Sequence, residues 1–136
     1  MKLKHAAAGL LPLAIAACMT PIATPLALAG STWRFTSING LAPVATDTSL
    51  QFAERLNANV GCNGLSGPWR LEGGRLVLQG PLVSTRMFCE GRMEQEAAVG
   101  ELLSGNPTLT LEGNTLTLTS GDHVAVLTRT SGIRPL

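Results

Sequence analysis

Short alternations of apolar and polar residues run through most of the chain after residue 30. TWRFTSI places Trp33 and Phe35 on one face, and SLQFAERL does the same for Leu50 and Phe52. In WRLEGGRLVLQG the apolar alternation stops at the glycine pair 73–74 and then resumes, as it does in a β-hairpin. The pattern therefore predicts short antiparallel strands separated by turns.

The last third of the chain alternates most strictly. TLTLEGNTLTLTSGDHVAVLTRT contains turn sequences at 113–114 and 121–122, which divide it into a three-stranded meander. Threonine is the main residue type on one face of these strands. We expect the opposite, apolar face to consist of Leu109, Leu111, Leu116, Leu118, Val124 and Val126.

One segment departs from this alternation. EGRMEQEAAVGELLSGN, from about Glu90 to Ser104, carries apolar residues at near-helical spacing, acidic residues toward its start and Gly105 after its end. This pattern is typical of an amphipathic helix. Many short strands and a single helix predict a mainly β fold (α+β), in which a curled or closed antiparallel sheet is capped by the helix on one side or at one end.

The first residues form a separate unit. MKLKH supplies positive charge, and the apolar run from Ala6 to Ala17 is too short to span a membrane, which needs roughly 20 residues. These are the n-region and h-region of an export signal. We therefore divide the chain into a signal peptide (1–17), a linker (18–29) and one folded domain (30–132).

Two cleavage sites compete, and they predict different locations. IAAC has the form of a lipoprotein signal, in which Cys18 is lipidated and becomes the mature N-terminus, whereas ALAG offers cleavage after Ala29. Because a strand begins near Trp33, cleavage after Ala29 would leave almost no lead into it. We therefore favour a lipid anchor on Cys18. Met19 is not the aspartate of an inner-membrane retention signal, which indicates a periplasm-facing outer-membrane lipoprotein; the alternative is a soluble periplasmic or secreted protein.

The charge of the exported part excludes some classes of partner. Both lysines, Lys2 and Lys4, lie in the signal, and eight arginines stand against nine acidic residues in the rest. With His123 neutral, this gives a net charge of −1 and no basic footprint for nucleic acid. A Schiff-base lysine is excluded as well.

Two cysteines remain beyond Cys18, namely Cys62 and Cys89, 27 positions apart. In an oxidising compartment such a pair predicts a disulfide, and closing a loop of this size stabilises a domain by about 3 to 4 kcal/mol. The glycines around Cys62 let the backbone bend toward its partner. Two alternatives stay open: a reactive thiol at the start of the helix, or a zinc site with His123, which would lack a fourth ligand.

Other candidate chemistry is sparse. His123 follows Asp122 at a hairpin tip, where we expect a solvated side chain rather than a catalytic base. Glu94 and Glu96 are two positions apart on the helix, so they do not face each other. GCNGLSG lacks the lysine and the spacing of a phosphate-binding loop. We expect no catalytic, cofactor-binding or metal-binding residues, and we expect the strand aromatics to pack in the core rather than form a ligand platform.

Four stretches together resemble the META domain family: GSTWRFTSING, VGCNGLSGPWRLEGGRLVL, STRMFCEGRMEQEAAVGELLSG and LTLEGNTLTLTSGDHVAVLTRT. The resemblance runs from about Leu28 to Thr130. Its most specific elements are G-C-N-x-x-x-G at 61–67 and T-x-M-x-C at 85–89, followed by an acidic helix. Gly64 departs from the family pattern, in which an aromatic residue or arginine is common at this position.

The META domain is a domain of unknown function that includes the HslJ-like heat-shock lipoproteins. The resemblance implies a small lipocalin-like antiparallel barrel or strongly curved sheet with one helix, located on the cell envelope and linked to stress tolerance. It brings no catalytic residues.

These observations favour a monomeric, non-enzymatic lipoprotein that supports envelope integrity under stress by binding an envelope protein or component. One alternative is a carrier that holds a small apolar ligand inside the barrel. Another is a secreted hydrolase inhibitor that acts through the 39–48 loop, NGLAPVATDT.

Overall fold

The computed structural model describes residues 9, 12 and 28–131. The predicted signal peptide, apart from Gly9 and Pro12, and the predicted lipidation site Cys18 lie outside the described residues. Residues 28–131 form these elements: β1 (Ser31–Ile38), β2 (Ser49–Phe52), β3 (Leu56–Asn59), β4 (Gly64–Gly67), β5 (Trp69–Glu72), β6 (Arg75–Leu78), β7 (Val83–Ser84), α2 (Met93–Ser104), β8 (Thr108–Glu112), β9 (Thr115–Ser120) and β10 (His123–Ser131).

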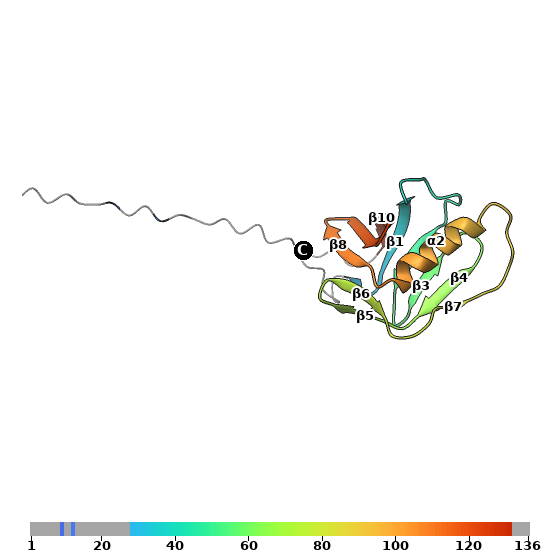
Figure 1. Cartoon of the computed structure of the whole chain (residues 1–136), viewed down its shortest axis with the longest axis horizontal. Coiled ribbons are helices and arrows are strands. Elements are labelled where there is room, and N and C mark those ends of the chain that lie inside the picture. Colours follow the sequence, from blue (N-terminus) through green and yellow to red (C-terminus); the bar gives the residue numbers. More distant parts are fainter. Residues whose placement is uncertain (1–8, 10–11, 13–27, 132–136) are drawn as a thin grey trace, which may run out of the picture.

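All ten of these strands belong to one antiparallel sheet. Its order is β5-β6-β8-β9-β10-β1-β2-β3-β4-β7, so the first and last described strands are paired in the middle and the edges come from the centre of the sequence. The sheet is curled into a half-barrel, and α2 lies across it (Figure 1). The mainly β fold with one helix, predicted from the sequence, is confirmed in the described part of the chain.

The curl brings the two ends of the sheet together. β4 and β5 belong to opposite ends of the strand order, yet Pro68 alone separates them along the chain. The Trp69 indole Nε1 at the start of β5 donates a hydrogen bond of 2.8 Å to the Ala53 carbonyl, just after β2. The Trp69 ring also meets Phe52 edge-on, with centroids 5.0 Å apart. These contacts hold the half-barrel in its curled form.

The core lies between the sheet and the helix. Trp33, Phe35 and Phe52 are buried, as the strand alternation predicts, and Trp69 packs against the core while remaining partly exposed. α2 contributes three buried apolar side chains. The largest fully buried side chains come from the sheet, from α2 and, for Leu28 and Val60, from residues that flank strands: Trp33, Phe52, Leu28, Leu50, Leu56, Leu76, Leu102, Leu103, Leu116, Leu118, Leu127 and Val60.

Helix α2 begins later than the sequence pattern indicates. The expected start was Glu90, but the helical hydrogen bonding begins at Met93. Gly91 has φ = 75°, which is outside the helical region, so residues 90–92 form a turn instead. The helix ends as predicted before Gly105, whose backbone N–H donates to the Glu101 carbonyl at 3.0 Å.

The inward face of β10 differs from the prediction. Leu118 of β9 pairs with Ala125, and Leu116 pairs with Leu127. Opposed residues in an antiparallel pair share a face, so Ala125 and Leu127 are buried while Val124 is 38% exposed. The prediction that Val124 and Val126 lie in the core was therefore wrong. Even-numbered residues point inward in β9, but after the two-residue turn at 121–122 odd-numbered residues point inward in β10.

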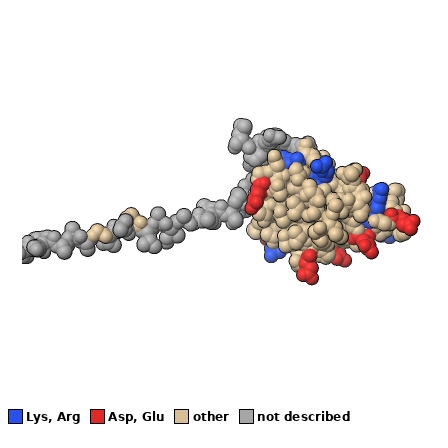
Figure 2. Space-filling model, turned by 90° about the horizontal axis from the view of Figure 1, so that it is seen from above, with Lys and Arg blue, Asp and Glu red and all other residues tan. Residues whose placement is uncertain are grey.

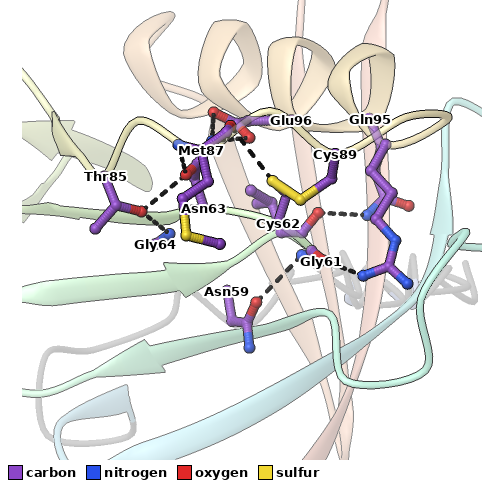
Figure 3. The surroundings of a disulfide bond; sticks show 12 residues. Asn59, Gly61, Cys62, Asn63, Gly64, Thr85, Met87, Cys89, Gln95 and Glu96 are labelled. Atoms are coloured by element: carbon purple, nitrogen blue, oxygen red, sulfur yellow. Dashed lines mark hydrogen bonds between the residues drawn. A yellow bond between two sulfur atoms is a disulfide. The ribbon is translucent and has the colours of Figure 1, made fainter.

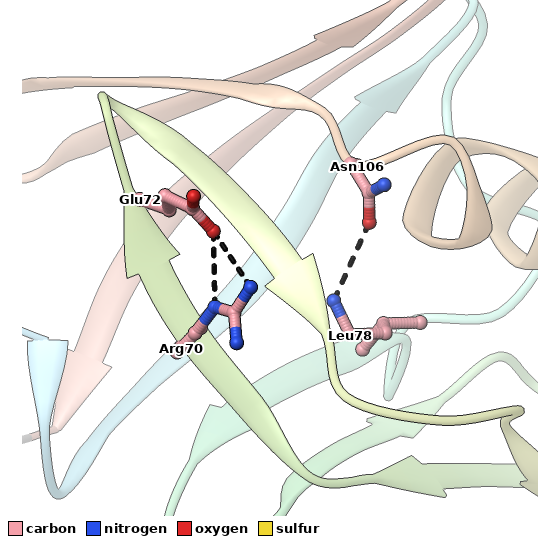
Figure 4. A network of polar contacts seen from close by, with 4 residues as sticks. All are labelled: Arg70, Glu72, Leu78 and Asn106. Carbon is pink, nitrogen blue, oxygen red and sulfur yellow. Dashed lines mark hydrogen bonds and ion pairs between the residues drawn. The ribbon is translucent and has the colours of Figure 1, made fainter.

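The β5–β6 hairpin forms as predicted around Gly73 and Gly74, whose φ values are 57° and 76°. Arg70 and Glu72 form an exposed ion pair on β5 with a shortest distance of 2.7 Å. At the other side of the hairpin, the Leu78 backbone N–H donates to the Asn106 side-chain oxygen at 3.4 Å (Figure 4). This contact ties the hairpin to the segment after α2.

The described domain includes residues before β1. Leu28 is fully buried, and its carbonyl accepts a hydrogen bond from the Ser31 hydroxyl. Ser31 Oγ in turn accepts from the Trp33 indole at 2.7 Å. The Arg129 guanidinium lies 4.4 Å from the Trp33 ring centroid, and burial lowers the pKa of Arg129, although arginine keeps its charge. The chain therefore enters the core upstream of the expected boundary at residue 30.

Candidate functional site

A disulfide joins the turn after β3 to the segment before α2. The sulfur atoms of Cys62 and Cys89 are 2.08 Å apart and the two Cα atoms 5.8 Å apart. This is the pair that the sequence predicts. Since both sulfurs are covalently bonded, neither is a thiolate, and the alternatives of a reactive thiol and of a zinc site with His123 are not formed in this structure.

Asn63, next to Cys62, is the centre of the polar contacts in this region (Figure 3). It is 2% exposed. Its amide nitrogen donates to the Met87 carbonyl at 2.8 Å and to both Glu96 carboxylate oxygens at 3.0 and 2.8 Å. Its oxygen accepts from the Met87 N–H at 2.7 Å and from the Thr85 hydroxyl at 3.0 Å. Asn63 therefore fixes residues 85–89, which we call the 85–89 loop, to the start of α2.

Gln95 performs a similar task on the other side of α2. It is buried, and its oxygen accepts from the Val44 N–H at 2.8 Å. Its nitrogen donates to the Val60 carbonyl at 2.9 Å and the Thr48 hydroxyl at 3.2 Å. One amide thus connects the helix to Val60, just after β3, and to the 39–48 loop.

Gly61 is required where these contacts meet. Its φ is 92°, and a Cβ at this position would lie 3.0 Å from the Cβ of Ala45. The Gly61 carbonyl accepts a hydrogen bond from the Arg92 guanidinium. The glycine before Cys62 therefore allows a left-handed turn in a crowded place. It is needed there because a side chain would clash, in addition to the flexibility that the sequence indicates.

The 85–89 loop presents two large apolar side chains to solvent. Met87 is 61% exposed and Phe88 is 80% exposed. An open groove of about 400 Å³ lies beside them and is also lined by Met93 and Glu96 of α2. A backbone held by the disulfide and by Asn63 thus carries an exposed aromatic and a thioether side chain on one rigid edge.

Of the remaining sequence candidates, His123 and Glu94 lie apart from this loop, whereas Glu96 lies beside it. His123 lies between two elements: its Nδ1 is 3.3 Å from the Asn39 amide nitrogen and its Nε2 is 2.9 Å from a Glu101 carboxylate oxygen. We expected a merely solvated ring, whereas the structure uses it to connect β10, the Asn39 turn and α2. Glu96 points at Asn63, while Glu94 lines a different groove, so the two do not act together.

Among residues 28–131 there is no group of three or more histidine, cysteine, aspartate or glutamate side chains placed to hold a metal ion. In the same described part, no helix has the length and apolar character needed to cross a membrane. Charged side chains of both signs surround a broad uncharged area in the face shown in Figure 2.

Sequence reasoning singled out the cysteines but missed Asn63 and Gln95. The motif G-C-N contained the signal for Asn63, because an asparagine beside a bridged cysteine can bond the strand that the bridge brings near. Gln95 gave no comparable signal, since its partners, two backbone groups and the Thr48 hydroxyl, lie far away in the sequence.

Comparison with known proteins places this arrangement in a family. The model of the META domain matches residues 26–132. The chain belongs to the META domain family. The bridge and the Asn63 contacts therefore occupy the two most specific motifs of this META domain.

Two solved structures share the fold. One NMR structure has a TM-score of 0.69 and 28% sequence identity, covering 78% of this chain and 94% of its own. An NMR structure of a protein from Burkholderia xenovorans has a TM-score of 0.67 and 18% identity, covering 96% of this chain and 99% of its own, and shows the fold alone. No curated protein matches the chain.

Proposed function

We propose that this META-domain protein is a non-enzymatic envelope lipoprotein that supports envelope integrity and stress tolerance by binding an envelope protein or component through the 85–89 loop. The observation that carries the proposal is the exposure of Phe88 and Met87 on a backbone fixed by a disulfide and by Asn63. A rigid loop loses little conformational entropy on association, and aromatic side chains commonly supply the energy at the centre of an interface.

The envelope location is supported by two observations of different kinds. The sequence carries a lipoprotein-type signal ending at Cys18, and the disulfide suits an oxidising compartment. Leu28 also favours cleavage before Cys18 over cleavage after Ala29. A chain beginning at Gly30 would lack a side chain that is fully buried in the core.

The packing of the interior disfavours a carrier of small apolar ligands. Trp33, Phe52 and Leu50 fill the space that such a ligand would occupy. The grooves of the described residues lie at the surface instead: one beside the 85–89 loop, one between residues 38–44 and α2, and one on the outer face of the sheet.

The hydrolase inhibitor keeps one observation in its favour. Leu41 and Val44, both in the 39–48 loop, are 72% and 56% exposed, and Gln95 bonds the backbone of Val44. This second loop therefore also presents apolar side chains from a fixed base. It provides a matched comparison for the first.

The test is complementation of a strain of the source organism that lacks this gene. The full-length chain should restore survival under detergent and heat stress. Phe88→Ser should lose most of this rescue with an unchanged melting temperature, because an exposed side chain contributes little to folding. Leu41→Ser, at an equally exposed position, should rescue like the parent chain.

Each variant has an outcome that counts against the proposal. Full rescue by Phe88→Ser would remove the 85–89 loop from the function. Failure of Leu41→Ser together with rescue by Phe88→Ser would favour the inhibitor loop instead.

A second test addresses the anchor. The intact mass of the protein from the native envelope fraction should correspond to a chain that begins at a diacylglyceryl-modified Cys18, and reduction should add about two daltons for one bridge. Cys18→Ala should release the protein from the membrane fraction. A mass that begins at Gly30 would contradict the lipoprotein proposal.

A further inference from the structure

A second groove lies on the outer face of the sheet, away from the core. In β2, Leu50 and Phe52 point inward, so Ser49 and Gln51 point outward, and the same alternation continues in β3. Residues of β1 to β4 and β7, most of them outward, line an open groove of about 690 Å³ together with Cys62 and Thr85. Ligand sites in proteins typically have volumes of about 300 to 1,000 Å³.

The lining of this groove has an unusual chemical composition for the surface of a protein with 19 charged residues in its sequence. It contains no ionisable side chain, since its cysteine is bridged. Hydroxyl and carboxamide groups supply its polar atoms: Thr32, Ser49, Gln51, Asn57, Asn59, Ser66, Ser84 and Thr85. Two charged side chains, one of each sign, bond lining residues: Arg55 donates to the Ser66 hydroxyl at 3.1 Å, and Asp47 accepts from the Asn59 amide at 3.5 Å.

The strand register places four of these side chains in one row. Thr32 is paired with Gln51, Gln51 with Asn57, and Asn57 with Ser66. At about 4.8 Å between neighbouring strands, the row extends over about 14 Å. The Gln51 amide and the Ser49 hydroxyl make no hydrogen bond with any described residue, so they can bond a ligand.

Such a row fits a neutral oligosaccharide. Carboxamides and hydroxyls both donate and accept hydrogen bonds, which matches the hydroxyl groups that repeat along a sugar chain. A groove lined by neutral side chains, with one bonded charge of each sign beside it, gives little net Coulombic attraction to an anionic or cationic ligand. We infer that the outer groove of β1–β4 and β7 is a binding site for neutral oligosaccharides; it includes Thr85 but not the exposed Met87 and Phe88 side chains of the 85–89 loop.

Gly64 keeps the groove open. It belongs to the lining, and a Cβ at this position would meet only the Ala58 carbonyl oxygen, at 4.0 Å. Its φ is not in the left-handed region. A larger side chain can therefore be introduced at Gly64 to fill the groove without straining the strand.

The experiment is an NMR titration of the ¹⁵N-labelled chain from Cys18 onward, carrying Cys18→Ser. Cellotetraose, chitotetraose and maltotetraose are the probes. At least one of them should produce saturable shifts in the side-chain amide signals of Gln51, Asn57 and Asn59. Water competes for every contact in an open groove, so we expect weak binding that needs oligosaccharide concentrations of about 10 mM to approach saturation.

Variants localise the site. Gly64→Leu should weaken binding at least about tenfold, and the matched control Gly80→Leu, at a glycine with equal room but outside the groove, should leave the Kd within about twofold. Should Gly64→Leu fail to fold, the double substitution Gln51→Ala/Asn57→Ala should give the same loss. Phe88→Ser should bind like the parent chain.

Three results would overturn the inference. The first is the absence of saturable shifts with all three neutral probes. The second is binding of oligosaccharides only when they are sulfated or carry free amino groups. The third is a Kd that neither the Gly64 variant nor the double variant changes, which would place the bound sugar elsewhere.

Discussion

At the scale of single residues, Asn63 is the side chain on which the most contacts depend. Asn63→Ala would leave the Met87 backbone groups and the Glu96 carboxylate without their buried partner. We expect the free energy of unfolding to fall by about 2 to 4 kcal/mol, measured by urea denaturation at an unchanged m-value.

The control for this prediction is Asn57→Ala. Asn57 is exposed on the outer face, and its amide bonds only the nearby Arg55 carbonyl, at 3.1 Å. Its loss should change stability by no more than about 0.5 kcal/mol. Equal effects of the two substitutions would show that the contacts of Asn63 do not stabilise the fold.

The role of a residue was predictable from the sequence where a covalent bond and the number of residues of one type determined it. Cys62 and Cys89 could be paired because they are the even set left once Cys18 is assigned to the predicted export signal. The roles of Gln95 and His123 depend on which loops reach them in three dimensions, and Asn39 is 84 positions from His123. Periodicity along the chain contains no such information.

At the scale of elements, substitutions can test which face of β10 points into the core. Leu127→Ala removes a fully buried side chain and should destabilise the domain by about 2 to 5 kcal/mol. Val124→Ala changes an outward position and should have an effect of at most about 0.5 kcal/mol. Thermal and urea unfolding of both variants provide the measurement. A larger loss of stability for Val124→Ala than for Leu127→Ala would show that Val124 lies in the core, as the sequence pattern predicts.

Strands and turns were predictable because their signals are local. The alternation of β1 and β2 and the glycine pair of the β5–β6 hairpin each identify an element from a few neighbouring residues. The inward face of β10 was not predictable, since both of its faces carry aliphatic residues and only pairing with β9 decides between them. The late start of α2 likewise depends on the conformation of Gly91.

At the scale of the whole molecule, Leu28 sets how much chain the domain needs. We compare a chain that begins at Cys18, carrying Cys18→Ser, with one that begins at Gly30. The shorter chain lacks the buried Leu28 side chain and the carbonyl that accepts from Ser31, and should be less stable by about 2 to 5 kcal/mol.

A further variant separates the side chain from the chain length. Leu28→Ala in the longer chain should account for most of this loss, as followed by urea denaturation. If the chain beginning at Gly30 is as stable as the longer chain, Leu28 does not anchor the domain and the support it gives to the upstream cleavage site disappears.

The central position of β10 has a consequence for when the molecule can fold. β10 pairs with β9 on one side and with β1 on the other, so without it the sheet separates into β5-β6-β8-β9 and β1-β2-β3-β4-β7. Before β10 is synthesised, no strand pairs these two halves, although α2 contacts both β1 and β6. The complete sheet can therefore form only after residues 123–131 have been synthesised, and the pairing that closes it joins β10 to β1 at the other end of the described domain, a long-range contact of the kind that slows folding.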